Sequence, residues 1–419
     1  MELDFSKIKK VFFIGIGGIG ISAGAKLALS RGMEVSGVND EESPKTLEPL
    51  QQAGVNIIFQ KDFKKLPVTD LYIYSDAWIY RGPDIIASAR ASGKPVLSYF
   101  EFLGILAKEY KVIAISGTHG KTTTTAMVAN ILIDAGLDPT VIVGSFVKKF
   151  KSNFRAGKGE YLVVEADEYN RHMLLFHPFI GVVTNIEADH LDCYKDLADI
   201  QNAFDQYLSQ SEHKITNYKK YLPQVPKLSV PGAHNRLNAA AALAVAEIFK
   251  IPAETAQKSL AEFTGTWRRL EKRFETKAGT IVYDDYAHHP TEIRASLSAL
   301  RELYPKGIKK LTVVFQPHLY SRTKAFFTEF TESFDEADRI VFLPIYFARE
   351  DPDPSVSSEK LAQKVAERGS DARFYSDFAS AASFIKGLAL GENDVLVTMG
   401  AGEAYKVADL LFSPEGVVK

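Results

Sequence analysis

The chain has 419 residues, a length that suggests about three domains. Of these residues 46% are hydrophobic and 24% charged, a composition typical of a globular protein. Its 50 basic and 52 acidic residues nearly cancel, so charge gives no reason to expect nucleic acid or an anionic membrane surface as a partner. The single cysteine, Cys193, excludes an intrachain disulfide, and the sequence has neither a secretory signal nor a run of roughly 20 apolar residues. We therefore expect a cytoplasmic protein.

Short apolar strands alternate with helical stretches along the whole chain, which is typical of α/β folds with parallel sheets. Segments 9–32, 111–136 and 393–411 each have the pattern of a strand, a glycine-containing loop and a helix. Loops of this kind lie at the carboxyl ends of parallel strands, where such sheets bind ligands.

The first of these loops contains Gly15, Gly17 and Gly20 in the pattern G-x-G-x-x-G, and Asp40 lies 20 residues beyond the last glycine. Glycines let the backbone approach a diphosphate closely, and the N-terminus of the following helix favours its charge. The pattern therefore indicates a nucleotide or nucleotide-sugar site. The alternative is a tight turn that needs glycine only for packing.

The second loop, Gly117-Thr-His-Gly-Lys-Thr, differs from the usual phosphate-loop pattern G-x-x-x-x-G-K-[ST], because Ile115 stands where that pattern has its first glycine. The components of a triphosphate site are nevertheless present. Lys121 supplies positive charge, Thr122 supplies a hydroxyl suited to Mg²⁺, and a helix begins there. We interpret the segment as a shortened phosphate loop and not as a flexible turn.

Acidic residues follow the next two strands of this region. Glu165 and Asp167-Glu168 end one apolar run, and Asp189-His190 follows another. Carboxylates at the carboxyl edge of a sheet can hold Mg²⁺ directly or through water. Solvated loop acids and a structural histidine are the alternatives.

Two later segments allow two interpretations each. His234, Asn235 and Asn238 open an alanine-rich helix, where asparagine amides either cap the helix or bond to a purine edge. Arg268 and Arg269 either belong to a solvated linker or stabilise the charge of a transferring phosphate.

Segment 285–290, DYAHHP, precedes a further helix, and its histidines either cap that helix or contact substrate. The signals together suit ATP-driven chemistry with two nucleotide-like groups. Hydride transfer would leave the second glycine loop without a role, and a kinase would leave the first without one.

Six motifs occur in one order along the chain: GTHGKTTTT, EADE, NIEADH, HNRLNAAAA, DDYAHHPTE and FQPHLYSRT. In these motifs the chain resembles the Mur ligases, the ATP-dependent amide-bond ligases of peptidoglycan synthesis, over nearly its whole length. The resemblance implies an α/β fold with three domains. These are a Rossmann-like domain at 1–108 that binds a UDP-sugar, a central P-loop ATPase domain with a mainly parallel sheet at 109–265, and a Rossmann-like domain at 266–419 that binds an amino acid. The segment between 191 and 233 is shorter than in typical members, so the central domain is expected to lack peripheral strands.

The N-terminal segment 13–37 is most similar to the branch of the family that joins L-alanine to UDP-N-acetylmuramate. The implied substrates are UDP-N-acetylmuramate, L-alanine and ATP, with two Mg²⁺ ions that Mn²⁺ can replace. The lactyl carboxylate attacks the γ-phosphate, and the amine of L-alanine then attacks the acyl phosphate. The alternatives are a recycling ligase that joins a ready-made peptide to the same sugar, and a non-catalytic nucleotide-sugar-binding protein. We expect a monomer or weak homodimer that binds neither nucleic acid nor membrane.

The resemblance also implies roles for individual residues at each ligand. The ATP contacts are Gly117, Thr118, His119, Gly120, Lys121, Thr122, Thr123, His234, Asn235 and Asn238, and the metal ligands are Thr122, Glu165 and His190. The UDP-sugar contacts are Gly15, Gly17, Gly18, Gly20, Asp40 and Ser75. The residues facing the amino acid are Tyr286, His288, His318 and Arg322. The catalytic residues are Lys121, His190, Arg268, Arg269 and His288.

Two positions depart from the family pattern. Leu319 stands where relatives often have arginine, and the segment around Gln60 lacks the histidine commonly found near the uracil. We expect no carbamylated lysine near the metals, because the branch that adds L-alanine does not need one.

Segment 264–274 is expected to act as a hinge at Gly265, so that ATP and the UDP-sugar together compact the protein.

Overall fold

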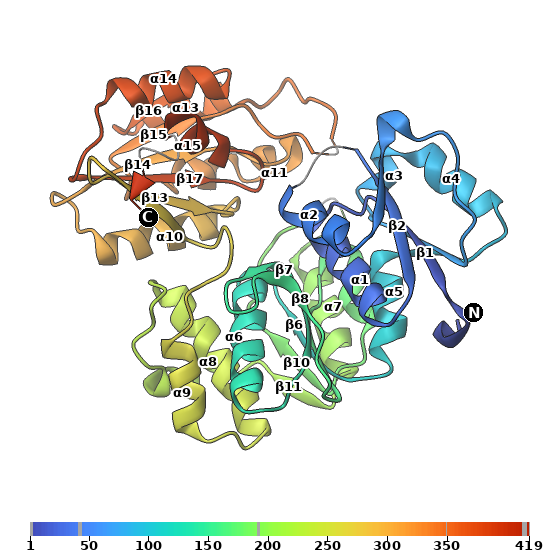
Figure 1. Ribbon diagram of the computed structural model, residues 1–419. Helices are drawn as coiled ribbons and strands as arrows, with labels where there is room; N and C mark the ends of the chain where they lie inside the picture. Colours follow the sequence, from blue (N-terminus) through green and yellow to red (C-terminus); the bar gives the residue numbers. More distant parts are fainter. Residues whose placement is uncertain (1–2, 41–43, 191–192, 349, 413–416, 419) are drawn as a thin grey trace. The chain divides into compact units, whose positions relative to one another are not determined.

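Figure 1 shows the computed structural model of the chain, which describes residues 3–40, 44–190, 193–348, 350–412 and 417–418. Among these residues, every helix is too short or too polar to cross a membrane.

The chain divides into two compact units. The first unit comprises residues 1–226 and 238–262, and the second comprises residues 227–237 and 263–419. One of the boundaries falls inside helix α8 (Ala233–Ile248), so its first turn belongs to the second unit and the rest to the first.

The first sheet of the first unit has five strands, all parallel. Its central strand is apolar on both faces because helices cover both: Val11 and Phe13 face one core cluster, and Phe12 and Ile14 face another. The strand order changes direction at β1, so the crevice beyond its carboxyl end is a ligand-binding position. In sheet order the strands are β3 (Asn56–Phe59), β2 (Glu34–Asn39), β1 (Lys10–Ile14), β4 (Leu71–Tyr74) and β5 (Val96–Ser98), and the helices are α1 (Ile19–Ser30), α2 (Pro44–Gln52), α3 (Trp78–Arg81) and α4 (Pro83–Ala91).

The second sheet of this unit has six strands and is parallel except for β8, which pairs antiparallel with β7. Its strand β6 leads through the second glycine loop into α6, which packs on β6, β7 and β9 (Figure 1). In sheet order the strands are β11 (His213–Ile215), β10 (Ile180–Val183), β6 (Lys111–Ser116), β9 (Tyr161–Glu165), β7 (Thr140–Val147) and β8 (Ser152–Arg155). The helices are α6 (Lys121–Asp134), α7 (Leu197–Ser209), α8 and α9 (Ala253–Ala261).

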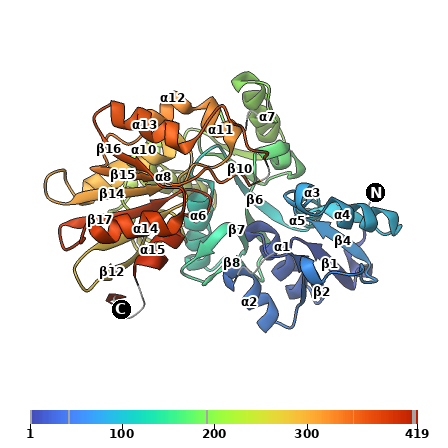
Figure 2. The same ribbon diagram turned by 90° about the horizontal axis from the view of Figure 1, so that it is seen from above.

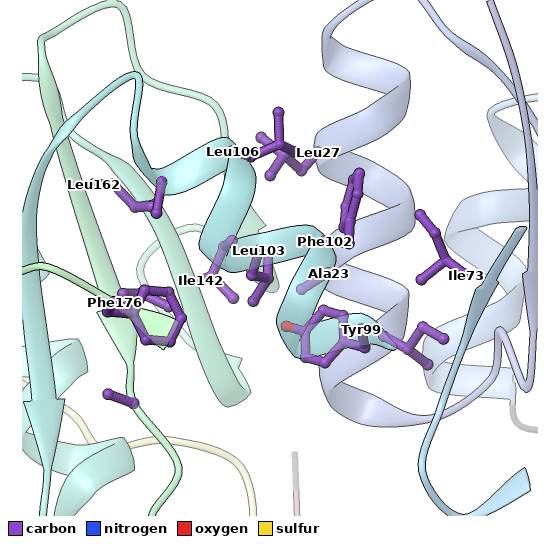
Figure 3. Close-up of a cluster of buried hydrophobic side chains, with 14 of the residues drawn as sticks. Ala23, Leu27, Ile73, Tyr99, Phe102, Leu103, Leu106, Ile142, Leu162 and Phe176 are labelled. Atoms are coloured by element: carbon purple, nitrogen blue, oxygen red, sulfur yellow. The ribbon is translucent and has the colours of Figure 1, made fainter. Parts of the chain in front are cut away.

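A single hydrophobic core joins the two sheets of the first unit, and helix α5 (Tyr99–Ala107) lies within it. The helix begins at a capping box between Ser98 and Glu101. In Figure 3, Phe102 of α5 lies on the side of Ile73 of the first sheet, and Leu103 lies next to Ile142 of the second sheet. The sheet that carries the first glycine loop and the sheet that carries the second are therefore packed together as one body.

The second unit contains a seven-stranded sheet, in which β12 runs antiparallel to both of its neighbours and the other pairs are parallel. Helices α14 and α15 cover one face, and α10, α12 and α13 cover the other (Figure 2). In sheet order the strands are β16 (Asp371–Phe374), β15 (Arg339–Phe342), β14 (Lys310–Phe315), β17 (Asp394–Met399), β13 (Ile281–Asp285), β12 (Glu271–Thr276) and β18 (Val417–Val418). The helices are α10 (Pro290–Leu303), α11 (Tyr320–Ala325), α12 (Phe327–Thr331), α13 (Ser358–Glu367), α14 (Phe378–Gly387) and α15 (Tyr405–Leu411).

The predicted fold class is confirmed, because the chain forms three mainly parallel sheets, each accompanied by helices. The domain boundaries near 108 and 265 stay a prediction. In the segment expected to be short, the described residues form α7, the three-residue strand β11 and a 3₁₀ helix at Lys219–Gln224.

Candidate active site

The first glycine loop, residues 15–20, is held tightly by its neighbours. Gly15 has φ 84°, and a Cβ atom there would lie 2.3 Å from the Trp78 ring. A Cβ atom at Gly17 would overlap Asn39, whose Oδ1 accepts a hydrogen bond from the Gly17 amide at 2.9 Å. Packing therefore requires glycine at both positions, and the loop also ends at the N-terminus of α1, where anionic charge is favoured.

The other residues assigned to the UDP-sugar lie around this loop. Gly18 is the N-cap of α1, and Gly20 lies in its first turn. Ser75 follows β4, and its amide donates to the last carbonyl of β1 at 3.0 Å, which brings it to the same crevice. Asp40 accepts a hydrogen bond from Arg81 at 2.6 Å.

The second glycine loop, residues 117–122, closes around the side chain of its own lysine. Gly117 has φ 131° and Gly120 has φ 84°, conformations that favour glycine. Lys121 Nζ donates to the carbonyl oxygens of Gly117 at 2.7 Å and of Thr118 at 3.2 Å. A loop that lacks the first glycine of the usual pattern is thus still a compact turn with its lysine at the centre.

Further hydrogen bonds tie this loop to the end of β10. The Thr118 amide donates to the Asn185 carbonyl at 3.0 Å, and the His119 amide donates to the Asn185 side chain at 2.9 Å. The Thr184 hydroxyl donates to the His119 carbonyl at 2.6 Å, and Thr123 is buried in the first turn of α6. The conformation of the loop is therefore fixed by the protein's own hydrogen bonds.

A buried charged cluster lies beside the second glycine loop. Glu168 is only 3% exposed, and its carboxylate lies 2.7 Å from Lys121 Nζ and 3.4 Å from His190 Nε2. Burial alone would raise the pKa of Glu168, but the charge of Lys121 and the contact with His190 outweigh it and lower that pKa. Burial would lower the pKa of Lys121 and of His190, but their interactions with Glu168 and its acidic neighbours raise both. Lys121 is therefore kept charged, as phosphate binding requires.

The residues assigned to Mg²⁺ offer suitable donors. Thr122 Oγ1 donates to Glu165 Oε2 at 3.2 Å, so a hydroxyl and a carboxylate meet at the end of β9. Mg²⁺ prefers oxygen ligands, and this pair fits the ion. Nδ1 of His190 is buried and has no hydrogen-bond partner among the described residues, which suits a ligand of a second metal or of a phosphate.

The residues at the start of α8 differ in their surroundings. Asn238 lies beside the second glycine loop, because a Cβ atom at Gly120 would lie 2.4 Å from its Oδ1. Asn235 instead donates from Nδ2 to the Pro231 carbonyl at 2.7 Å, as a residue that fixes the start of the helix would. His234 belongs, with Asn235, to the second unit.

The largely buried imidazole of His234 makes stability depend on pH. Burial lowers its pKa from 6.5 to about 4, so between these values the unfolded chain binds a proton that the folded protein does not. Stability should therefore fall as pH decreases through this window, by about 2 kcal/mol. Urea unfolding at pH 7 and pH 4.5 should show a smaller pH effect in His234→Gln than in the unsubstituted protein or in the control His213→Gln. An unchanged pH dependence in His234→Gln would contradict the assignment.

The two arginines of the predicted linker have different environments in the second unit. Arg268 is buried, with Nε 2.7 Å from Asp284 Oδ2 and its Nη atoms donating to the carbonyls of Gly402 at 3.0 Å and Gly400 at 2.7 Å. Its guanidinium is thus held by groups of its own unit. Arg269 is only partly buried, its guanidinium lies 5.0 Å from the centre of the Tyr286 ring, and its phosphate contact stays a prediction.

We expect alanine substitutions to separate these two arginines. Arg268→Ala leaves Asp284 buried without its partner and should lower the free energy of unfolding by roughly 3–5 kcal/mol. Arg269→Ala should lower turnover while changing stability by about 1 kcal/mol or less. Urea unfolding and ATP turnover of both variants check this, and an Arg269→Ala protein with full turnover would remove Arg269 from the site.

The four residues assigned to the amino acid lie together in the second unit, after β13 and β14. The ring centroids of His288 and His318 are 5.7 Å apart, and those of Tyr286 and His288 are 5.4 Å apart. Arg322 Nη1 lies 3.2 Å from His318 Nδ1. The structure thus brings two imidazoles, a phenol and a guanidinium to one edge of the sheet.

The two consecutive histidines of the DYAHHP segment have different roles. His289 Nδ1 accepts a hydrogen bond from the Thr291 amide, and with Glu292 it forms the capping box of α10. His288 Nδ1 lies 2.9 Å from the Tyr286 carbonyl, and because a carbonyl only accepts, Nδ1 carries the hydrogen and Nε2 is the acceptor of the neutral ring. His289 therefore caps the helix, and His288 is oriented by the Tyr286 carbonyl and lies 3.4 Å from Glu292.

Both departures from the family pattern have visible consequences. Leu319 is buried, with φ 71°, and its amide donates to the Tyr346 carbonyl at 2.9 Å. Gln60 Nε2 donates to the Arg81 carbonyl at 3.2 Å, next to the Arg81–Asp40 pair. Leu319 is thus packed in the interior of the second unit, whereas Gln60 makes its hydrogen bond near the surface of the first.

Sequence reasoning assigned no role in the site to Asn39 and Gly144, and it considered Glu168 only as a possible Mg²⁺ ligand. Glu168 pairs with Lys121, Asn39 holds the first glycine loop, and the Gly144 amide donates to Glu165 Oε1 at 2.5 Å. The motif EADE contained a signal for Glu168, since it places a second glutamate three residues beyond Glu165. Asn39 and Gly144 lie in ordinary strand sequences and gave none.

Models of one family match three consecutive segments of the chain. They are described as "Mur ligase family, catalytic domain" at 10–111, "Mur ligase middle domain" at 115–225 and "Mur ligase, glutamate ligase domain" at 268–402.

Two relatives that match over nearly their whole length carry the same name. The chain is 37% identical over 460 aligned positions to the UDP-N-acetylmuramate–L-alanine ligase of Clostridium kluyveri, covering 98% of this chain and 99% of that protein. It is 36% identical to the ligase of the same name from Caldanaerobacter subterraneus subsp. tengcongensis, covering 98% of each. Because 460 aligned positions exceed the 419 residues here, the Clostridium protein contains residues without a counterpart in this chain.

Two solved structures also match nearly the whole chain. The UDP-N-acetylmuramate–alanine ligase of Thermotoga maritima matches with a TM-score of 0.80 at 27% identity, over 96% of this chain and 98% of that one. A murein peptide ligase from Psychrobacter arcticus, 22% identical with a TM-score of 0.70 over 96% of this chain and 98% of that one, shares the fold. The family predicted from the six sequence motifs is thereby confirmed: the chain belongs to the Mur ligase family.

Proposed function

We propose that the chain is an ATP-dependent ligase that joins L-alanine to UDP-N-acetylmuramate. The observation that carries the proposal is the cluster of Lys121, Glu168 and His190 beside the Thr122–Glu165 pair. It lies in the same unit as the first glycine loop, in a chain that is similar over 98% of its length to ligases of that name.

In the first step the lactyl carboxylate of the sugar attacks the γ-phosphorus of ATP, and the bond from that phosphorus to ADP breaks. Lys121 holds the β- and γ-phosphates from the centre of its loop, and loop amides contribute further donors. Thr122, Glu165 and His190 would hold Mg²⁺, which when bound neutralises charge between the carboxylate and the triphosphate. Asn238, beside the loop, would contact the nucleotide base.

In the second step the amine of L-alanine attacks the acyl carbon, and phosphate leaves with the bridging oxygen. The amine must first lose a proton, and His288 Nε2 is suited to accept it because Nδ1 is held by the Tyr286 carbonyl. Arg322, next to His318, supplies a guanidinium for the carboxylate of the amino acid. Tyr286 and His318 complete the walls of this site.

The first glycine loop binds the UDP diphosphate in this proposal, at the N-terminus of α1 and beside Ser75. The recycling ligase and the non-catalytic binding protein remain the alternatives. A complete set of lysine, hydroxyl, carboxylate and imidazole argues against a protein that only binds nucleotide-sugar. The likeness to the murein peptide ligase concerns the fold and does not favour the recycling reaction.

One assay separates the three functions. Phosphate release from ATP is measured with UDP-N-acetylmuramate and a panel of amino acids, together with a tripeptide. The proposal predicts release with L-alanine and little with the tripeptide. Release only with the tripeptide would assign the recycling reaction, and no release with any acceptor would assign a binding protein.

A further inference from the structure

A buried polar cluster connects the helix of the first glycine loop to the hairpin of strands β7 and β8. Asn153 on β8 is fully buried. Its Nδ2 donates to the Ile19 carbonyl at 2.5 Å and to Ser22 Oγ at 2.9 Å, and its Oδ1 accepts from Lys26 Nζ at 2.7 Å. All three partners lie on α1, and Ile19 is the first residue of that helix. One asparagine of the second sheet thus uses both polar atoms of its side chain to hold the helix that follows the first loop.

Lys26 strengthens the same connection. Its ammonium also donates to Ser152 Oγ at 3.1 Å and lies 5.4 Å from the centre of the Phe146 ring on β7. Burial lowers the pKa of Lys26 to about 8, so the group is held away from water and depends on these partners. Both strands of the hairpin are therefore bound to α1.

On its other side, the same hairpin holds the carboxylate of Glu165, the proposed Mg²⁺ ligand. The amide of Gly144 on β7 donates to Glu165 Oε1 at 2.5 Å, and Glu165 Oε2 accepts from Thr122 at 3.2 Å. A Cβ atom at Gly144 would lie 2.7 Å from Glu165 Oε2, so this strand approaches the carboxylate as closely as glycine allows. Groups that bond to a metal ligand in this way set its orientation.

We propose, on the basis of the function proposed above, that Asn153 and Gly144 are positioning residues that connect the two substrate loops through the β7–β8 hairpin. Asn153 fixes the hairpin to the helix of the UDP-sugar loop, and Gly144 fixes Glu165 to the hairpin. A ligand that orders the N-terminus of α1 thereby orders the carboxylate at the ATP loop. The second ligand then binds to a site that is already ordered, so each ligand tightens the binding of the other.

Calorimetry measures this coupling without turnover. The dissociation constant of a non-hydrolysable ATP analogue with Mg²⁺ is determined with and without saturating UDP-N-acetylmuramate. We expect the sugar to tighten binding about tenfold in the unsubstituted protein. In Asn153→Leu, which removes the polar atoms at similar size, this factor should fall to about one, while each ligand alone binds within about threefold of normal.

A matched control lies on the same strand. Arg155 pairs with Asp138 and with the Pro139 carbonyl, and neither partner lies on α1. Arg155→Ala should therefore keep the tenfold factor. If Asn153→Leu fails to fold, Lys26→Met removes only the ammonium and should lower the factor partway. Full coupling in Asn153→Leu, or equal loss in Arg155→Ala, would overturn the inference.

Failure of the inference and failure of the proposed function give different results. A protein that forms the amide normally but shows no coupling between the two ligands retains the proposed function and refutes the positioning role. A protein that does not bind UDP-N-acetylmuramate at all refutes both.

Discussion

In Lys121→Ala, amide formation should fall by at least roughly 10²–10³-fold, while the dissociation constant for UDP-N-acetylmuramate alone stays within about threefold of normal. Lys121 Nζ lies at the centre of the second glycine loop, bonded to two loop carbonyls and to Glu168, so its loss removes the positive charge expected at the transferring phosphate. The first glycine loop is bonded to other residues, Asn39 and Thr46, and should keep its shape. Turnover assays and calorimetric titration of the sugar measure the two effects.

The control for this substitution is Lys111→Ala. Lys111 lies on strand β6, which leads into the loop, but its side chain is half exposed and pairs with Glu160 at the surface. Lys111→Ala should therefore leave turnover unchanged. Lys121→Ala also leaves the buried Glu168 carboxylate without its partner, which can destabilise the fold. The double variant Lys121→Ala, Glu168→Gln removes that buried charge, so it separates the effect of the lost lysine charge from an effect of unfolding. Complete loss of sugar binding in folded variants would show that residues 15–20 are not an independent UDP site.

Glu165→Gln should weaken Mg²⁺ binding by about 10–100-fold and lower turnover, and high Mg²⁺ should restore part of the activity. Glutamine keeps the shape of the side chain, and its oxygen can still accept from Gly144 or Thr122. Only the charge on the metal ligand is removed. When turnover is measured against Mg²⁺ concentration, the concentration that gives half-maximal turnover should therefore be higher in Glu165→Gln than in the unsubstituted protein.

Glu160→Gln provides the comparison for the metal experiment. Glu160 directly precedes β9, the strand that Glu165 ends, but it is exposed and pairs with Lys111. Its Mg²⁺ dependence should match that of the unsubstituted protein. If Glu165→Gln behaved in the same way at limiting Mg²⁺, Glu165 would not be a metal ligand.

The fold could be predicted because its determinants are local. Apolar runs such as VFFI and VIAI mark strands buried on both faces, and the glycine loops that follow mark the carboxyl ends of the sheets. The positions of Lys121, Thr122 and Glu165 followed from the same logic, because carboxyl ends of parallel strands meet at one edge. These three residues do lie at one edge of the second sheet.

Other features of the site depend on contacts between segments far apart in sequence. Asn153 and Ile19 are separated by 134 residues, and so are Arg268 and Gly402. No local sequence pattern can therefore predict either hydrogen bond. The choice between cap and substrate contact for the two consecutive histidines depended on hydrogen-bond direction, which sequence does not contain. The buried position of Arg268 likewise came only from the packing of the second unit.

Isotope transfer provides a test of the proposed reaction itself. UDP-N-acetylmuramate labelled with ¹⁸O in both oxygens of its lactyl carboxylate is incubated with ATP, Mg²⁺ and L-alanine, and the released phosphate is analysed by mass spectrometry. If the carboxylate is phosphorylated and the amine displaces that phosphate, each phosphate must carry one ¹⁸O atom from the sugar. Released phosphate that contains no ¹⁸O, while the amide product accumulates, would contradict the acyl-phosphate route.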